Sequence, residues 1–386
     1  MTLLITFFLI IAGAGFLINQ HAGELRHGKG MVWGLFAYHT FFSLVYYVWA
    51  LFNSSDSKAY YRNALTGRRG DSWTEIYNFG TAFIEFLAYP FIHGLGFTYV
   101  SMMFLFGFFG FVGFFYLYLF VSEQTQFRHK LLGIDVIVLL FFLPIAHFYS
   151  ASLGKGSVIL AGIGMLFYAL NRMGKRFILL VLGAVIILHV RAHIMAAICG
   201  AAVLASVFSS RGIKVWQKFV IVVIAGAAIV PLLLQTLDYA GVDEADAEAI
   251  TEFTEKRTSD LKQANSAVDI DNYSQPMKLF TFLFRPLFID SPNALGLIVS
   301  VENLIYLLLF LRCFSPRFIK FLIQSRWMVK MALVTFFVVS IALAQISSNM
   351  GIAIRQKSQV MYLFVFVLLA YADYAYRTER KLIIGE

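Results

Sequence analysis

The side chains best suited to chemistry are basic residues beside long apolar segments. Arg191 and His193 interrupt an apolar run that extends from Phe177 to Phe208. An arginine near the middle of a bilayer costs about 3 kcal/mol on insertion scales, so it is retained where it faces protein, water or a ligand. The run is too long for one helix across a membrane. We therefore expect two short helices, Phe177–Leu188 and Ile194–Phe208, with Arg191 and His193 in the turn between them.

Four further cations share this setting at the ends of apolar segments, namely Lys155, Arg285, Arg355 and Lys357. Cations that meet at a membrane surface suit a diphosphate, because guanidinium groups match phosphate oxygens and stabilise developing negative charge. Each also has a structural alternative. Lys155 could cap a helix C-terminus, Arg285 could reach lipid headgroups, and Lys357 could be solvated.

Carboxylates and hydroxyls accompany these cations in the same kind of segment. Asp56 and Tyr60 are four residues apart, so on a helix they share a face on which a carboxylate and a phenol could hold sugar hydroxyls. Arg69 follows in the same polar stretch. Glu302 and Glu85 stand in apolar surroundings, where a carboxylate is either paired with an arginine or functional. His193 is either a base or phosphate contact or a packing residue.

The composition indicates what must position these residues. Hydrophobic residues make up 60% of the chain and charged residues 14%, whereas a soluble domain is nearer half apolar and a quarter charged. We therefore expect an all-α, polytopic membrane protein with one transmembrane domain over residues 1–386. The net charge of +9 is explained by cytoplasmic loops and does not indicate nucleic-acid binding. No glycine-rich phosphate loop and no Cys/His cluster with metal-ligand spacing is present in the sequence.

Apolar runs of suitable length predict about eleven transmembrane helices. These are Thr2–Asn19, Met31–Phe52, Phe97–Val121, Leu131–Phe148, Ser157–Leu170, Phe177–Leu188, Ile194–Phe208, Phe219–Leu237, Ala294–Leu311, Trp327–Ile346 and Gln359–Tyr376.

Alternate loops are short and basic, which is typical of cytoplasmic loops. The N-terminus is then outside and the C-terminus cytoplasmic. Two long polar stretches fall on the outer side, residues 53–96 and 238–293. In the first, Phe79–Gly96 is expected to be an amphipathic or re-entrant helix, and Leu279–Phe288 in the second is similar. The acidic start of the second stretch suits a helix that is either a solvated surface helix or a lid.

Several short motifs resemble those of the EpsG-like and Wzy-type bacterial polysaccharide polymerases. They are Asp-x-x-x-Tyr-Tyr from Asp56, Ser-x-Gly-Lys ending at Lys155, the Arg-x-His break, Phe-Arg-Pro-Leu-Phe followed by Glu-Asn-Leu, and Asn-x-Gly-x-x-x-Arg-Gln around Arg355. The resemblance covers most of the chain in layout. It implies a GT-C-like fold and metal-independent transfer of a growing glycan from undecaprenyl diphosphate onto another lipid-linked unit. Such a reaction builds O-antigen, capsule or exopolysaccharide at the outer face of the bacterial inner membrane.

The resemblance also implies roles for individual residues. The expected catalytic residues are His193 or Asp56 as general base and Arg191 on the leaving diphosphate. The expected substrate- and diphosphate-binding residues are Lys155, Arg285, Arg355, Tyr60, Arg69, Glu302 and Lys357. The implied partners are the lipid-linked donor and acceptor, the bilayer, and chain-length regulator and flippase proteins, with no cofactor and no nucleic acid.

Two other functions fit part of the same pattern. A flippase or transporter of lipid-linked sugars would also need cations, but transporters often contain internal repeats, and none is visible here. A related membrane ligase, or an acyltransferase that uses His193, is the other alternative.

Overall fold

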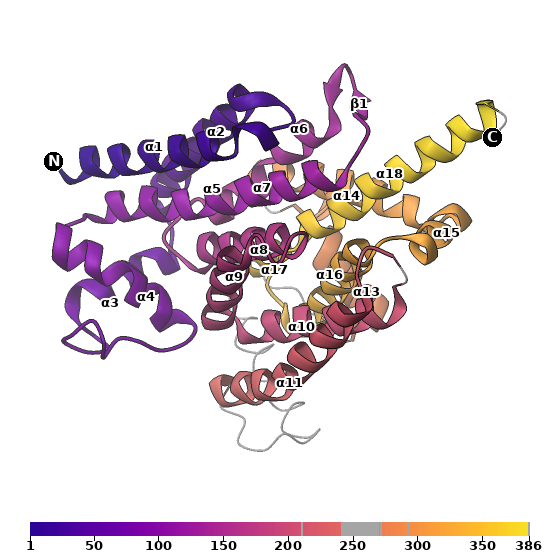
Figure 1. Cartoon of the computed structure of the whole chain (residues 1–386). Coiled ribbons are helices and arrows are strands. Elements are labelled where there is room, and N and C mark those ends of the chain that lie inside the picture. The colour runs from indigo at the N-terminus through magenta and orange to yellow at the C-terminus, as the bar shows by residue number, and fades with distance from the viewer. Residues whose placement is uncertain (210, 241–269, 271, 292–293, 385–386) are drawn as a thin grey trace. The chain divides into compact units, whose positions relative to one another are not determined.

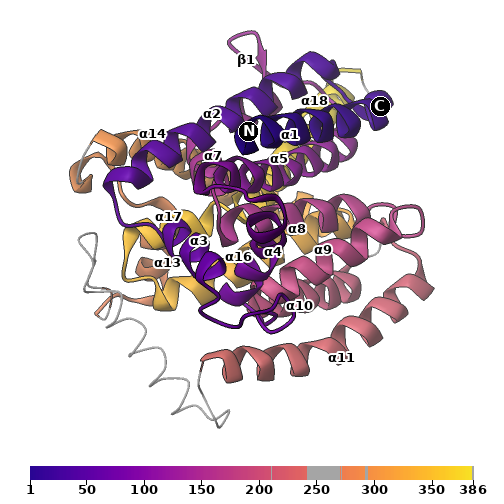
Figure 2. The same cartoon turned by 90° about the vertical axis from the view of Figure 1, so that its left-hand side faces the viewer.

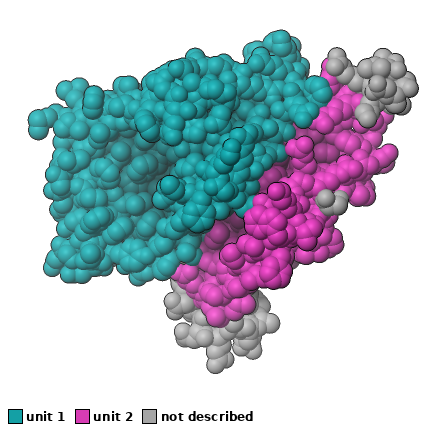
Figure 3. All heavy atoms as spheres, in the orientation of Figure 1, with its two compact units in different colours: residues 1–191 teal, residues 192–386 magenta. Residues whose placement is uncertain are grey.

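The computed structural model describes residues 1–209, 211–240, 270, 272–291 and 294–384 (Figure 1). The chain is mostly helical and divides into two compact units, Met1–Arg191 and Ala192–Glu386, which Figure 3 colours separately. The predicted single domain stays a prediction. The acidic lid helix predicted near residues 245–253 lies outside the described residues.

Unit 1 contains, in chain order, α1 (Thr2–Gln20), η1 (Ala22–Glu24), α2 (Gly28–Phe52), α3 (Asp56–Thr66), α4 (Thr81–Tyr89), η2 (Pro90–Gly94), α5 (Tyr99–Gln124), β1 (Lys130–Leu131), β2 (Ile134–Asp135), α6 (Val136–Phe141), α7 (Pro144–Ser150), α8 (Lys155–Leu170) and α9 (Phe177–Val190).

Unit 2 contains α10 (Ala192–Phe208), α11 (Val215–Ala240), α13 (Gln275–Phe284), η3 (Phe288–Asp290), α14 (Ala294–Leu311), η4 (Arg312–Phe314), α15 (Pro316–Gln324), α16 (Trp327–Ile346), α17 (Met350–Lys357) and α18 (Met361–Ile384).

Six helices among the described residues are long and apolar enough to cross a membrane, namely α1, α2, α5, α11, α14 and α16. A seventh candidate is the pair α17 and α18, which is bent by 51°. The expectation of a multi-pass helical membrane protein is therefore confirmed. Four shorter apolar segments, Val136–Ser150, α8, α9 and α10, coincide with the remaining predicted spans, so the count of eleven stays a prediction.

Two predicted boundaries can be compared directly with the structure. The break at Arg191 is confirmed, although α9 and α10 leave only that residue between them. The predicted span Leu131–Phe148 starts too early, because residues 130–135 form a β-hairpin and the helix begins at Val136. The prediction was wrong because it assigned Leu131, Leu132 and Ile134 to the helix on their apolar character alone, whereas in the structure they are exposed residues of the hairpin.

Glycines allow the central helices of unit 1 to approach each other closely. A Cβ on Gly164 of α8 would lie 2.4 Å from the carbonyl oxygen of Gly113 on α5. On the neighbouring side of α8, a Cβ on Gly162 would lie 3.2 Å from the carbonyl oxygen of Gly183 on α9. Small residues allow helix backbones to approach closely, which replaces the hydrophobic driving force that is missing within a bilayer. The backbone of α8 therefore packs directly against both α5 and α9.

Three basic loops of unit 1 meet at one end of its helices, which we call the basic end of unit 1. Arg26, after η1, donates to the carbonyl oxygen of Thr125 at 3.0 Å, and Arg128 donates to the carbonyl oxygen of Arg26 at 2.7 Å. The loop before α9 joins them through Arg176, which lies within 2.9 Å of a Glu24 oxygen and 2.8 Å of a Glu123 oxygen. All three loops belong to the set predicted to be cytoplasmic.

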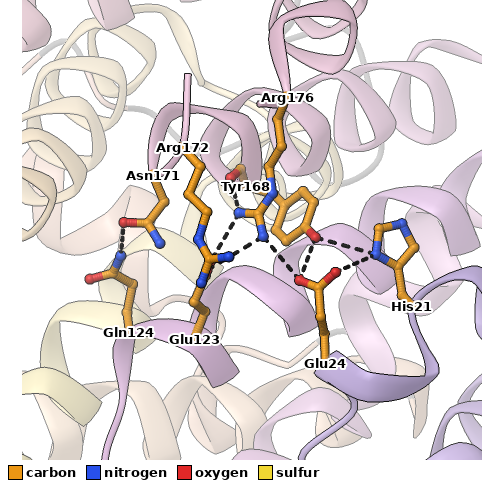
Figure 4. Close-up of polar contacts among 8 residues, drawn as sticks. All are labelled: His21, Glu24, Glu123, Gln124, Tyr168, Asn171, Arg172 and Arg176. Carbon is orange, nitrogen blue, oxygen red and sulfur yellow. Dashed lines mark hydrogen bonds and ion pairs between the residues drawn. The ribbon is translucent and has the colours of Figure 1, made fainter. Parts of the chain in front are cut away.

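Figure 4 shows how Arg176 organises this basic end. Its guanidinium also donates to the Tyr168 carbonyl oxygen at 2.9 Å and lies 3.5 Å from the centre of the Tyr168 ring. Tyr168 donates from its hydroxyl to Glu24 at 2.7 Å. Partial burial raises the pKa of Glu24, but the hydrogen bonds from Tyr168 and His21 and the charges of His21 and Arg176 outweigh it, so the net pKa is lowered.

Replacing Arg176 by methionine is expected to destabilise the protein by about 1–3 kcal/mol, because Glu24 and Glu123 each lose one ion pair. The loss is limited because Glu123 keeps Arg172, Glu24 keeps Tyr168 and His21, and Glu24 is only partly buried. Thermal unfolding in detergent measures this effect, with Lys175→Met, at an exposed position in the same loop, as the control.

The lowered pKa of Glu24 also predicts a pH dependence. A carboxyl whose pKa is lowered by folding stabilises the fold at pH values above its ordinary pKa of 4.5, and this contribution is lost as the pH falls through the folded-state pKa. Wild-type stability should therefore fall on acidification more steeply than that of Arg176→Met. Equal melting temperatures of Arg176→Met and Lys175→Met would contradict the prediction.

Unit 2 has a basic end of its own. The backbone N–H of Trp327 donates to the carbonyl oxygen of Arg211 at 3.0 Å, and Lys330 donates to the carbonyl oxygen of Phe208 at 2.8 Å. The loop before α15 joins α18 through Ser315 and Tyr371, whose hydroxyl oxygens are 3.0 Å apart. The predicted cytoplasmic loops of this unit therefore also lie together.

Candidate functional site

In unit 1, Tyr60 and Lys155 lie at the end opposite its basic end. The Tyr60 ring packs on the backbone before α8, where a Cβ on Gly154 would lie 3.4 Å from it. Lys155 is the first residue of α8 and is partly exposed, and its alternative role as a cap on a helix C-terminus stays a prediction. A cationic residue, Lys155, therefore begins α8 at the positive N-terminal end of the helix dipole.

Asp56 begins α3 and is exposed, whereas Tyr60 on the same helix is 8% exposed. A row of hydroxyl groups fixes the start of this helix. Ser55 caps it, and the Ser57 hydroxyl oxygen lies 2.7 Å from those of both Ser55 and Tyr99. The exposed carboxylate of Asp56 is therefore held on a rigid helix start, as a base at a site surface requires.

Arg69 and Glu85 form an ion pair that sequence spacing did not reveal. The Arg69 Nε lies 2.6 Å from a Glu85 oxygen, and the Asn63 amide donates to the other oxygen at 2.9 Å. Glu85 is fully buried, whereas 44% of the Arg69 side chain is exposed. Asn63 joins α3, and Arg69 the turn after α3, to Glu85 on α4, so the buried carboxylate has the partners that an apolar environment demands. Arg69 therefore has a structural role beside its predicted contact with substrate.

The C-terminal end of α9 holds the polar loop of residues 67–80 through His189. The backbone N–H of Gly80 donates to the His189 carbonyl oxygen at 2.7 Å. The His189 ring donates from Nδ1 to the Val185 carbonyl oxygen at 2.8 Å, so the neutral ring accepts from the Tyr77 hydroxyl through Nε2 at 2.6 Å. Phe79 stacks on the same ring with centroids 4.8 Å apart. Sequence analysis did not identify this contact.

Arg191 and His193 differ in exposure although they are two residues apart. Arg191 ends unit 1 and is 9% exposed, whereas His193 lies in the first turn of α10 in unit 2 and is exposed. A buried arginine at a helix break agrees with the prediction that it faces protein or a ligand.

In unit 2, the predicted residues gather around a non-helical turn that follows α13. Arg285 forms an ion pair with Asp290, and its Nη1 donates to the Tyr273 hydroxyl at 3.4 Å. Partial burial disfavours the charged form, but Asp290 and Tyr273 outweigh it and raise the pKa of Arg285 above its ordinary value. The guanidinium has five N–H donors, and these two contacts use two of them. Arg285 is thus held within protein, contrary to the alternative in which it reaches lipid headgroups.

Lys357 and Asn303 clamp the backbone on both sides of Arg285. The Lys357 ammonium group donates to the Leu283 carbonyl oxygen and to the Asn303 side-chain oxygen, each at 2.7 Å. The Asn303 amide nitrogen in turn donates to the Pro286 carbonyl oxygen at 2.8 Å. Lys357 is 1% exposed, so the interpretation of Lys357 as a solvated side chain is wrong.

The clamp has a clear physical cause. Asn303 is near the middle of α14, an 18-residue helix that forms most of a 20-residue candidate membrane span, so the irregular backbone of residues 283–286 lies level with the middle of that helix. Non-helical backbone at such a depth is tolerated where protein groups satisfy its carbonyl oxygens. Lys357 and Asn303 supply those donors. They therefore determine where Arg285 can lie.

Glu302 and Arg355 complete the predicted set in unit 2. Glu302 is 3% exposed, accepts from the Tyr306 hydroxyl at 2.9 Å, and directly precedes Asn303, which accepts from Lys357 at 2.7 Å. Arg355 is partly exposed and lies two residues before Lys357 on α17. The structure therefore places Arg285, Glu302 and Lys357 in one polar cluster, although they are far apart in the sequence.

Asn303, Asp290 and Asn63 were missed as site residues. For Asn303 a signal existed, because an amide inside an apolar run is itself a functional candidate. Within the part of the chain that the structure describes, no group of three or more His, Cys, Asp or Glu side chains could hold a metal ion.

Comparisons with known protein families, with curated proteins and with solved structures gave no match. The resemblance to polysaccharide polymerases therefore rests on the sequence motifs alone.

Proposed function

We propose that the chain is a bacterial inner-membrane glycosyltransferase that polymerises undecaprenyl-diphosphate-linked oligosaccharide units at the outer face of the membrane. It would have eleven spans and a GT-C-like fold, with the N-terminus outside and the C-terminus in the cytoplasm. The observation that carries the proposal is Arg285, a guanidinium fixed by a buried clamp away from the basic end of its unit. Cytoplasmic topology explains the other basic loops, but it does not explain this residue.

The proposed chemistry follows from charge. As the bond between the donor sugar and its diphosphate breaks, negative charge develops on the leaving oxygen, and a fixed arginine stabilises that charge without reorganising. Arg285 and Arg355 of unit 2 are proposed to bind the diphosphate, with Lys357 holding the Arg285 turn. The roles of Arg191 and Lys155, in unit 1, as further diphosphate contacts stay predictions from the sequence. Asp56 or His193, both exposed, would remove the proton from the acceptor hydroxyl. Tyr60 and Glu302 would orient the sugars or the arginines.

Arg285→Gln tests this function. In proteoliposomes supplied with a lipid-linked oligosaccharide, the wild-type protein should lengthen the glycan, and Arg285→Gln should do so at least about 100-fold more slowly. Glycan length on gels is the measurement. The control is Arg317→Gln, because 77% of the Arg317 side chain is exposed and it belongs to the basic end of unit 2.

Two outcomes would reject the proposal. Elongation by Arg285→Gln at the wild-type rate would remove its main support. Movement of labelled lipid-linked sugar across the vesicle membrane without any glycan growth would indicate a flippase or transporter instead.

A further inference from the structure

The β-hairpin of β1 and β2 exposes apolar side chains at its tip. Leu131 pairs with Ile134 across the hairpin, and Leu132 lies in the turn between them. The exposed fraction is 59% for Leu131, 48% for Ile134 and 93% for Leu132. In Figures 1 and 2 the hairpin points upward, above α1 and α2. Folding of the unit therefore leaves these side chains unburied.

The turn conformation strengthens this observation. Leu132 has a φ of 52° and Gly133 a φ of 81°, so both residues of the two-residue turn are in the left-handed region. Such turns favour Asn, Asp or Gly at the first position, because a Cβ with no local hydrogen bond is disfavoured there. The chain nevertheless has leucine at the most exposed position of the hairpin. An apolar group retained against both backbone preference and solvation points to a surface that it contacts.

The position of the hairpin indicates which surface that is. The candidate span α5 ends at Gln124, so the hairpin follows at the basic end of unit 1, where a membrane surface would lie. Arg128 fixes the base of the hairpin through its bond to Arg26, and Lys130 is exposed beside the apolar tip. An apolar tip flanked by a cation is the chemistry that binds an anionic lipid interface.

We propose that the hairpin inserts Leu131, Leu132 and Ile134 into the headgroup region of the membrane at the basic end, with Lys130 contacting anionic lipid phosphates. The anchor would fix the end of α5 relative to the bilayer. This inference does not depend on the glycosyltransferase activity.

The first test measures the depth of the tip in lipid nanodiscs. A fluorophore sensitive to polarity is attached to Leu132→Cys in a chain that also carries Cys199→Ala and Cys313→Ala. Its emission should shift to shorter wavelength, and nitroxide-labelled lipid should quench it more than iodide does, with a larger shift when phosphatidylglycerol is present. The control is Gly174→Cys, in the loop before α9, where a side chain would meet open space.

The second test separates lipid contact from folding. Leu132→Asn gives the turn its preferred Asn-Gly sequence and removes the apolar tip. Its melting temperature in detergent should equal or exceed that of the wild-type protein, whereas the increase that phosphatidylglycerol gives the wild-type protein should be lost.

Either of two results would overturn the proposal. One is emission from position 132 that matches position 174 and is quenched by iodide to the same extent, which would leave the tip in water or on a protein partner. The other is an undiminished response of Leu132→Asn to phosphatidylglycerol.

Discussion

Lys357→Met is expected to abolish most glycan elongation and to lower the stability of the protein. The substitution removes the donor that serves the Leu283 carbonyl oxygen and the Asn303 side chain, and both acceptors are buried. A buried acceptor without its donor costs about 1–3 kcal/mol, so the two together should cost about 2–5 kcal/mol. Because the same bonds position Arg285, elongation should fall about 100-fold, the effect expected of a displacement near 1 Å at a reacting centre.

The experiment needs a control that removes a lysine without disturbing a clamp. Lys320→Met is suitable, because Lys320 is exposed on α15 at the basic end of unit 2. Thermal unfolding in detergent and glycan length in proteoliposomes are measured for both variants. If Lys357→Met matched Lys320→Met in both assays, the clamp would have no role.

A double-mutant cycle tests the clamp more directly. Lys357→Met and Asn303→Leu remove the two members separately and together. Because their side chains are in contact, the effects on the free energy of unfolding should be non-additive by about 0.5–3 kcal/mol. Additive effects would show that the two residues act independently.

Gly164→Ala is expected to be a strongly destabilising single-methyl change in unit 1. The added Cβ would lie 2.4 Å from the Gly113 carbonyl oxygen, which belongs to the α5 backbone and cannot rotate away. The two helices must separate, which costs about 1–3 kcal/mol for overpacking and more where backbone is displaced. The loss should appear as a lower melting temperature in detergent, and Gly113→Ala should behave similarly.

A matched glycine is available as the control. Gly226 lies within α11, where an added Cβ would meet nothing within 4 Å. Gly226→Ala should therefore be neutral or stabilising by about 0.5–1 kcal/mol, because alanine loses less backbone entropy in a helix. Equal effects of Gly164→Ala and Gly226→Ala would contradict close packing of α5 on α8.

Composition and apolar runs were enough to predict a helical membrane protein and most of its long helices. Apolar runs identified the long helices, because burial in a bilayer requires about 20 continuous apolar residues whatever lies around them. A single charged residue in such a run located the break at Arg191, since the cost of placing charge in hydrocarbon makes it conspicuous. The basic loops were recognised because charged residues are excluded from the apolar runs and gather between them. In each unit, the basic loops that the structure describes lie together at one end.

The contacts between polar groups could not be predicted without the folded structure. Lys357 contacts Leu283 and Asn303 across separations of 74 and 54 residues, and Arg69 contacts Glu85 across a separation of 16. Periodicity reports which face of one helix is apolar, but it carries no information on which neighbouring element covers that face. The hairpin at Leu131 also required the structure, because an apolar tip and the start of an apolar helix have the same composition. Spacing along one element is a local property, whereas a buried cation takes its partners from whichever backbone carbonyl oxygens the packing leaves without donors.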